Sequence, residues 1–229
     1  MRTKINATWI VGHDAGHHRL IHDGVVVYEG NKIIHVGKNF DGHVDATIDA
    51  TGKLVAPGFI DTHVHTGHRA THRLITDTGR PMYFGQPFLE ISVPKEGAVV
   101  KGDPRYLKDG DAGSEGAFAL NALFTVAELL RNGVTTFIEF GSQLRVQDSL
   151  LAEVTRLGTR AYLAPGYDCG RWVGDDKGRL KRMRNDQLGL DGLKTALNWI
   201  EKHDGDAGGR VRGILVPREV ETSSVELLR

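Results

Sequence analysis

The chain has 229 residues, of which 40% are hydrophobic, and its 29 basic residues balance its 29 acidic ones. This composition allows a sizeable core in one large or two modest domains. The even charge gives no sign of a nucleic-acid or membrane partner, and no run reaches the roughly 18 apolar residues of a membrane span. The single cysteine, Cys169, cannot form an internal disulfide, and the N-terminus lacks a signal-peptide core, so we expect a cytoplasmic protein.

Residues 1–57 consist of short β-prone runs separated by turn residues. The run VVVYEGNKIIHVG predicts a hairpin that turns at Gly30 and Asn31. The histidines of the segment 13–22 are interpreted as solvated turn residues. We therefore predict a small all-β domain over residues 1–57.

After Pro57 the pattern changes to alternating strands and helices, which predicts βα units and a parallel sheet over residues 58–229. We expect strands at 58–63, 134–140, 160–165 and 211–216, and helices at 115–132, 146–157 and 186–203. Each strand is a short apolar run, as a parallel strand covered on both faces requires.

The run FIDTHVH, residues 59–65, ends in two histidines that are separated by one residue. Alternate side chains of a strand point the same way, so His63 and His65 should share one face with Asp61. Neutral imidazole is a common ligand of divalent metals, and a strand end holds two rings at a fixed separation. We predict a site for one divalent ion, zinc, cobalt or iron; a hydrogen-bonded pair of structural histidines is the alternative.

The run PGFIDTHVH resembles the first barrel strand of the amidohydrolase superfamily, metal-dependent hydrolases and deaminases with a (β/α)8 TIM-type barrel. The run WIVGHDAGHHRLIHDGVVVYEGNKIIHVG resembles the small β-sandwich that precedes the barrel, and ELLRNGVTTFIEFG resembles the second strand with its approach helix. The nearest resemblance is to the branch of triazine chlorohydrolases and adenosine- and guanine-type deaminases. It implies a β-sandwich over 1–57, part of a composite domain, and about four barrel strands over 58–229.

Four strands are half of such a barrel. The resemblance implies that further histidine and aspartate ligands, and the proton-transfer residues, lie on a C-terminal half that this chain does not include. We therefore expect that second half as a partner, together with a homo-oligomer. Residues 66–114 show no clear periodicity and are predicted to be a lid or an oligomer-contact insertion.

Several polar residues follow the predicted strands, where barrel enzymes place pocket residues. We expect substrate contacts from Glu139, Asp168 and Trp172, with solvated rim residues as the alternative reading. His68, just after the histidine pair, is also placed to reach the pocket. Asp61 either hydrogen-bonds a ligand imidazole from behind or caps the strand.

The fourth predicted strand departs from the resemblance. Arg218 stands where that branch carries a histidine, and a guanidinium is always charged, so it suits a carbonyl or carboxylate oxygen of a substrate. This places purine or pterin deamination in doubt. Glu219 is an alternative bridging ligand for a second metal, but we favour a single ion.

The leading hypothesis is a metal-dependent hydrolase that uses metal-activated water to cleave a C–N, C–S or C–Cl bond in a small molecule, such as an amide, carbamate, thiocarbamate or substituted ring. One alternative is a purine- or pterin-type deaminase. The other is a catalytically inactive amidohydrolase-like protein with a binding or assembly role.

Overall fold

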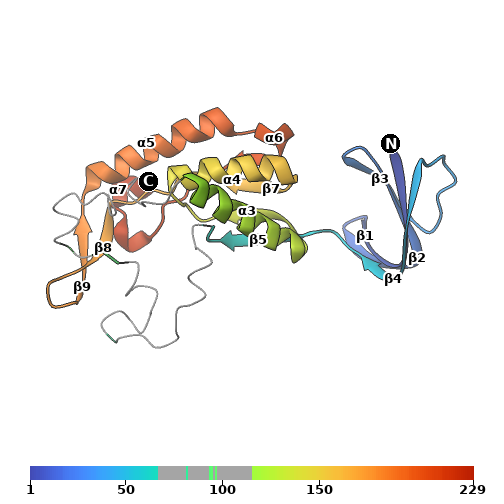
Figure 1. Cartoon of the computed structure of the whole chain (residues 1–229), viewed down its shortest axis with the longest axis horizontal. Coiled ribbons are helices and arrows are strands. Elements are labelled where there is room, and N and C mark those ends of the chain that lie inside the picture. The colour runs from blue at the N-terminus through green and yellow to red at the C-terminus, as the bar shows by residue number, and fades with distance from the viewer. Residues whose placement is uncertain (67–80, 82–92, 95, 97–114) are drawn as a thin grey trace. The chain divides into compact units, whose positions relative to one another are not determined.

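The computed structural model describes residues 1–66, 81, 93, 94, 96 and 115–229 (Figure 1). The chain divides into two compact units, Met1–Gly58 and Phe59–Arg229. The predicted insertion over 66–114 lies almost entirely outside the described residues, and so does His68. No helix in the described part is both long and apolar enough to cross a membrane.

The first unit is built on one four-stranded sheet with the order β3-β2-β1-β4. Its strands are β1 (Arg2–Asp14), β2 (His17–Glu29), β3 (Lys32–Gly37) and β4 (Ala46–Val55). The predicted hairpin is confirmed, because Glu29 pairs with Lys32 across an antiparallel turn at Gly30, whose φ is 59°. The second sheet of a sandwich stays a prediction, since residues 1–58 form this single sheet.

The interpretation of the segment 13–22 as turn residues is wrong. Strands β1 and β2 continue to Asp14 and from His17, so they are joined by two residues alone. Ala15 and Gly16 have φ of 49° and 83°, as a tight hairpin turn requires. The histidines therefore lie in an antiparallel ladder, where His13 pairs with His18 and the two ring centroids are 5.4 Å apart.

The second unit contains a parallel sheet with the order β10-β7-β6-β5. Its strands are β5 (Phe59–Val64), β6 (Val134–Glu139), β7 (Arg160–Leu163) and β10 (Val211–Gly213), so the four predicted strands are confirmed with shifted ends. In chain order, each new strand pairs with the outer edge of the strand before it, always in the same direction across the sheet. This is the order in which a parallel barrel grows, whereas an open doubly wound sheet reverses direction at a switch point.

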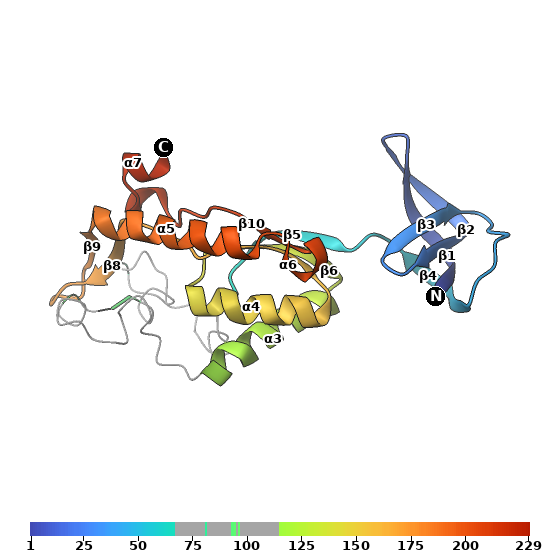
Figure 2. The ribbon, with the colours of Figure 1, turned by 90° about the horizontal axis from the view of Figure 1, so that it is seen from above.

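The three predicted helices are also confirmed: α3 (Glu115–Arg131), α4 (Leu144–Leu157) and α5 (Asp186–His203). Helix α4 lies between α3 and α5, and it ends at Gly158 in the left-handed conformation that a C-cap favours (Figures 1 and 2). The short elements α6 (Asp206–Gly209), η3 (Val220–Thr222) and α7 (Val225–Leu228) complete the unit.

The helices and the sheet share one hydrophobic core. Its buried residues come from the helices, from alternate strand positions and from the residue after β7: Val64, Ala122, Val126, Phe137, Val146, Leu150, Val154, Ala161, Leu163, Ala164, Trp199 and Val211. Since the buried strand residues recur every second position, one sheet face is packed against the helices. The other face carries residues such as Ile60 and Tyr162, which are 67% and 40% exposed.

A second hairpin, β8 (Gly170–Gly174) and β9 (Leu180–Arg184), follows β7 and was not predicted. Its turn is held by the Asp175 carboxylate, which accepts hydrogen bonds from the backbone N–H groups of Lys177 and Arg179. Residues 171–184 include six basic residues, four of them in the two strands, and their charge hides the strand pattern in the sequence.

Candidate metal centre

The histidine pair lies at the carboxyl end of β5, on the sheet face away from the helices. Val64 is paired with Glu139 of β6, and both side chains are buried on the helix side. Because side chains alternate along a strand, His63 and His65 on either side of Val64 point to the opposite face. The two histidines therefore share one face, as predicted.

Asp61 does not share that face. It pairs with the fully buried Phe137, and the register shifts before Val64 pairs with Glu139, so two residues of β5 lie opposite one residue of β6. This β-bulge reverses the alternation between Asp61 and His63. The carboxylate of Asp61 instead accepts a hydrogen bond of 3.1 Å from the backbone N–H of His63, and this contact supports the bulge.

The two imidazole rings converge. Their Nε2 atoms are 2.9 Å apart, and their centroids are 4.8 Å apart with the planes at 66°. Phe140, the residue after β6, stacks on the ring of His63 at 4.0 Å with an angle of 18°. Partial burial lowers the pKa of His65, and His63 adds to this effect while Glu139 opposes it. The shift favours the neutral imidazole, which is the form that binds metal.

This geometry fits two ligands of one metal ion. Two nitrogens bound to zinc at about 2.0–2.1 Å in a tetrahedron lie about 3.3 Å apart, so the pair opens by only a few tenths of an ångström to accept an ion. The observed distance equally suits a hydrogen bond between neutral rings. Among the described residues no group of three or more histidine, cysteine or acidic side chains is placed to hold a metal, so further ligands are needed.

Glu139 is not placed to contact a substrate, in contrast to the expectation from the sequence. Its side chain is fully buried on the helix side of β6. Its carboxylate accepts hydrogen bonds from Thr66 Oγ1 at 3.0 Å, from the backbone N–H and hydroxyl of Ser142, and from Gln147 Nε2 on α4. Phe140, the next residue, is the one whose ring contacts the histidine pair.

The other predicted pocket residues gather after β7 and β10. Arg218 Nε donates to the carbonyl oxygen of Gly141 at 2.9 Å, and its Nη1 lies 3.8 Å from Asp168 Oδ2. The carboxylate of Glu219 accepts a hydrogen bond from the Trp172 side chain. Asp168, Trp172, Arg218 and Glu219 therefore form one polar cluster, which we call the strand-end cluster.

Glu219 carries a perturbed carboxyl group. Desolvation raises its pKa, and the negative charges of Glu221 and Asp168 raise it further, whereas Trp172 and Arg218 oppose the shift. A carboxylate that bridges two metals has to be ionised and free to bind them. The contact with Trp172 ties Glu219 to the neighbouring hairpin, and its role as a bridging ligand stays a prediction.

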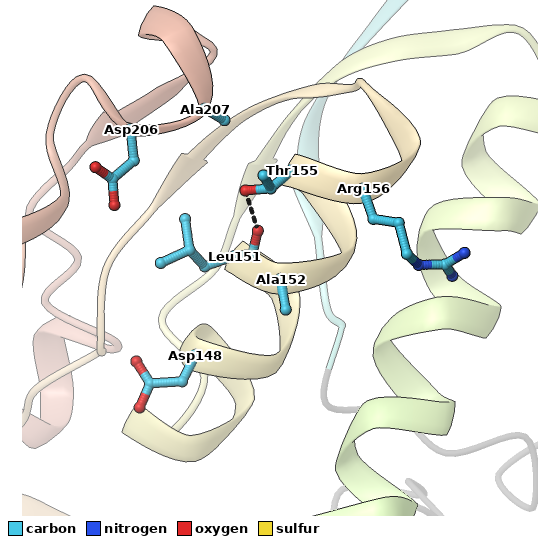
Figure 3. Close-up of a pocket in the computed structure, with 7 residues that line it drawn as sticks. All are labelled: Asp148, Leu151, Ala152, Thr155, Arg156, Asp206 and Ala207. Atoms are coloured by element: carbon cyan, nitrogen blue, oxygen red, sulfur yellow. Dashed lines mark hydrogen bonds between the residues drawn. The ribbon is translucent and has the colours of Figure 1, made fainter.

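A separate hollow of about 450 Å³ lies between α4 and α6 on the helix side of the unit (Figure 3). Its two carboxylates are already engaged, because Asp148 accepts from the Trp199 indole at 2.9 Å and Asp206 contacts His203 at 2.7 Å. The hollow lies on the helix side of the sheet, whereas the histidine pair lies on the other side. It is therefore a groove of the helix layer and not part of the metal centre.

Two buried polar residues on the helix side of the histidine pair were not predicted from the sequence. Thr66 and Gln147 are both fully buried although they are polar. Gln147 lies three residues before Leu150 and seven before Val154, on the apolar face of α4. A polar residue on such a face signals a buried hydrogen-bond partner, and this signal was available in the sequence.

No protein-family model matches the sequence. The 5-methylthioadenosine/S-adenosylhomocysteine deaminase of Bacillus cereus is 30% identical over 99% of this chain and 45% of its own length. The protein of the same name from Thermococcus kodakarensis is 29% identical over 89% of this chain and 40% of its own length. Atrazine chlorohydrolase from Arthrobacter aurescens TC1, solved in complex with zinc, superposes with a TM-score of 0.68 at 24% identity, over 98% of this chain and 48% of that one.

The parallel βα sheet with converging histidines at the end of its first strand defines an α/β protein with a candidate metal centre. Its curated relatives bear deaminase names, and its structural neighbours include a triazine hydrolase and a guanine deaminase, in agreement with the resemblance of the sequence to the amidohydrolase superfamily. The chain spans less than half the length of the curated relatives that it matches.

Two glycines allow the loops after β6 and β7 to approach beneath Arg218. A Cβ at Gly166 would lie 2.2 Å from the carbonyl oxygen of Gly141, the atom that anchors Arg218. We predict that Gly166→Ala lowers the free energy of unfolding by about 1–3 kcal/mol, because backbone atoms have to move apart. Urea unfolding of the purified protein measures this change.

Gly158→Ala is the matched control. A Cβ there meets no atom within 4 Å, but φ is 85°, so only left-handed strain of about 1 kcal/mol is expected. A loss at Gly166 no larger than the loss at Gly158 contradicts the close approach of the two loops.

Proposed function

We propose that this chain is the N-terminal half of a metal-dependent hydrolase that acts on a small molecule. The observation that carries the proposal is the convergence of His63 Nε2 and His65 Nε2 to 2.9 Å at the carboxyl end of β5. Catalytic residues of barrel enzymes come from this end of the strands. The zinc in the related atrazine chlorohydrolase structure supports a divalent ion as the group that the two nitrogens hold.

The two histidines would bind one ion through Nε2. Such an ion, when bound, lowers the pKa of a water molecule towards 7 and supplies a nucleophile at neutral pH. Phe140 restrains the His63 ring by stacking and excludes water from one side of it. The strand-end cluster provides the polar groups that orient the substrate, and the remaining ligands and proton-transfer groups come from the rest of the barrel.

The reaction class is hydrolytic displacement at an electrophilic carbon, with cleavage of a C–N, C–S or C–Cl bond. Deamination of an adenosine-like substrate is the second candidate, because relatives at 29% and 30% identity bear deaminase names. Against it stands Arg218, whose Nε is already bound to the Gly141 carbonyl and which cannot act as a neutral imidazole does. An inactive scaffold is the third reading, and it requires that no metal binds.

Metal content separates an enzyme from an inactive scaffold. We predict that the purified full-length protein carries a stoichiometric divalent ion and that His63→Ala or His65→Ala removes it, because each change deletes one of the two donors that this chain supplies. Elemental analysis by inductively coupled plasma mass spectrometry measures the ion. His13→Ala, which changes a histidine of the β1–β2 hairpin, is the control and is expected to keep the metal. A wild-type protein without metal would contradict the proposal of an enzyme.

The charge at position 218 separates the two reaction classes. We expect Arg218→His to raise ammonia release from 5′-deoxyadenosine by at least about 10-fold relative to the parent, since a neutral ring replaces a fixed cation. Parallel assays follow leaving-group release from amide, carbamate, thiocarbamate and chlorotriazine substrates. A parent protein that deaminates 5′-deoxyadenosine efficiently would establish the deaminase reading instead.

We further propose that the C-terminal half of the same protein covers the open parts of the sheet. Strand β5 is an edge strand in the described chain, and its Phe59 and Ile60 are each 67% exposed. Ile60 pairs with Thr136 on the face away from the helices, which becomes the interior of a closed barrel. A homo-oligomer and a cytoplasmic location stay predictions.

Coverage of this face is tested by placing a charge on it. Ile60→Lys in the full-length protein is expected to cost at least about 2 kcal/mol of unfolding free energy, because a buried ammonium loses its hydration. Leu197→Lys, at a position 48% exposed on α5, serves as the comparison. Equal small effects of the two lysines in urea unfolding would show that the barrel interior is not closed over β5.

A further inference from the structure

The residue after the histidine pair is held from two sides. Thr66 is fully buried, and its hydroxyl donates to Glu139 Oε1 at 3.0 Å. Its carbonyl oxygen accepts a hydrogen bond of 2.8 Å from Asn121 Nδ2 on α3. The backbone at Thr66 is therefore fixed to both β6 and the helix layer.

The two histidines differ in how the sheet supports them. His63 lies within β5, whose last bond to the next strand runs from the Phe140 N–H to the Val64 carbonyl oxygen at 3.0 Å. His65 lies one residue beyond that bond, between Val64 and the doubly anchored Thr66. The contacts of Thr66 are the next described restraint along the chain after His65.

Glu139 is an anchor with several supports of its own. Ser142 and Gln147 also donate to its carboxylate, so its position is fixed by the loop after β6 and by α4. Charge-assisted hydrogen bonds to a buried carboxylate are stronger than those between neutral groups. Because Thr66 donates to this fixed carboxylate, the backbone at the end of β5 is restrained relative to the helix layer.

We propose that Thr66 and Glu139 are positioning residues, which fix His65 from the helix side so that its Nε2 meets that of His63. The proposal rests on the proposed function, because it concerns the metal that the pair would hold. It gives the fully buried carboxylate of Glu139 a role that requires no contact with substrate or metal. The restraint acts through the peptide backbone between Thr66 and His65.

Thr66→Val tests this role, because valine keeps the shape of threonine and removes the hydroxyl. In the full-length protein we expect the affinity for Co²⁺ to fall by about 10-fold or more, the lower end of the effect of removing a residue that supports a metal ligand. The visible absorption of bound Co²⁺ should change as well, since the ligand geometry changes. In the metal-free protein, amide exchange at residues 65 and 66 should accelerate by at least about 10-fold while His63 is unchanged.

Two matched variants isolate the effect. Thr66→Ser retains the donor and is expected to restore the Co²⁺ affinity and spectrum of the parent. Thr155→Val makes the same substitution at an exposed site of α4, where the hydroxyl donates to the Leu151 carbonyl oxygen at 2.7 Å, and should leave both readouts unchanged (Figure 3).

The outcomes distinguish the two proposals. A parent protein that binds no Co²⁺ overturns the proposed function, and this inference falls with it. Binding by the parent with the same affinity, spectrum and exchange in Thr66→Val overturns the positioning role alone. A fall in affinity that Thr66→Ser shares in full also overturns it, because the hydroxyl would then not be the cause.

Discussion

The parallel pairing of β5 with β6, including its bulge, is the constraint on which the candidate site depends. The pair Val64 and Glu139 fixes which side chains face the helices, and the bulge before it decides that His63 and His65 face away from them. A shift of one residue would turn both rings into the helix layer. The hydrogen bond that the His63 N–H donates to the Asp61 carboxylate stabilises this register locally.

The loops after the strands extend this order beyond the sheet. The N–H of Gly166 donates to the Ser142 carbonyl, and the N–H of Arg218 donates to the Tyr167 carbonyl. The ends of β6, β7 and β10 are thereby joined in a row, and the guanidinium of Arg218 reaches back across it to Gly141. The strand-end cluster thus rests on backbone contacts that do not depend on any one side chain.

The sequence allowed the βα units to be predicted well, because each is encoded by local periodicity and by a glycine such as Gly158 at a helix end. The sequence also located the histidine pair, since His63 and His65 lie on either side of the paired residue Val64 and therefore share a face. It failed for Asp61, because strict alternation cannot reveal a bulge that arises from pairing with a distant strand. The prediction for Glu139 failed for a related reason, since a shift of one residue decides whether Glu139 or Phe140 lies on the face of the histidine pair.

The strand-and-turn errors have a different origin. The segment 13–22 is polar enough to resemble a loop, yet the cross-strand partners of β1 and β2 extend the ladder to the last residue before the turn. In the β8–β9 hairpin, Trp172 pairs with Arg182, and such contacts between strands become visible only when the strands are placed side by side. Local composition therefore identifies strands reliably only where a buried face imposes an apolar pattern.

The supports of the histidine pair and the strand-end cluster lie on different elements of the sheet. Thr66, Glu139 and Gln147 are enclosed between strands and helices, whereas Trp172, Arg218 and Glu219 lie after β7 and β10. Changes of ligand preference can therefore accumulate in the second group while the first is left intact. In evolutionary terms the fold separates the part that must be inherited unchanged from the part that is free to diversify.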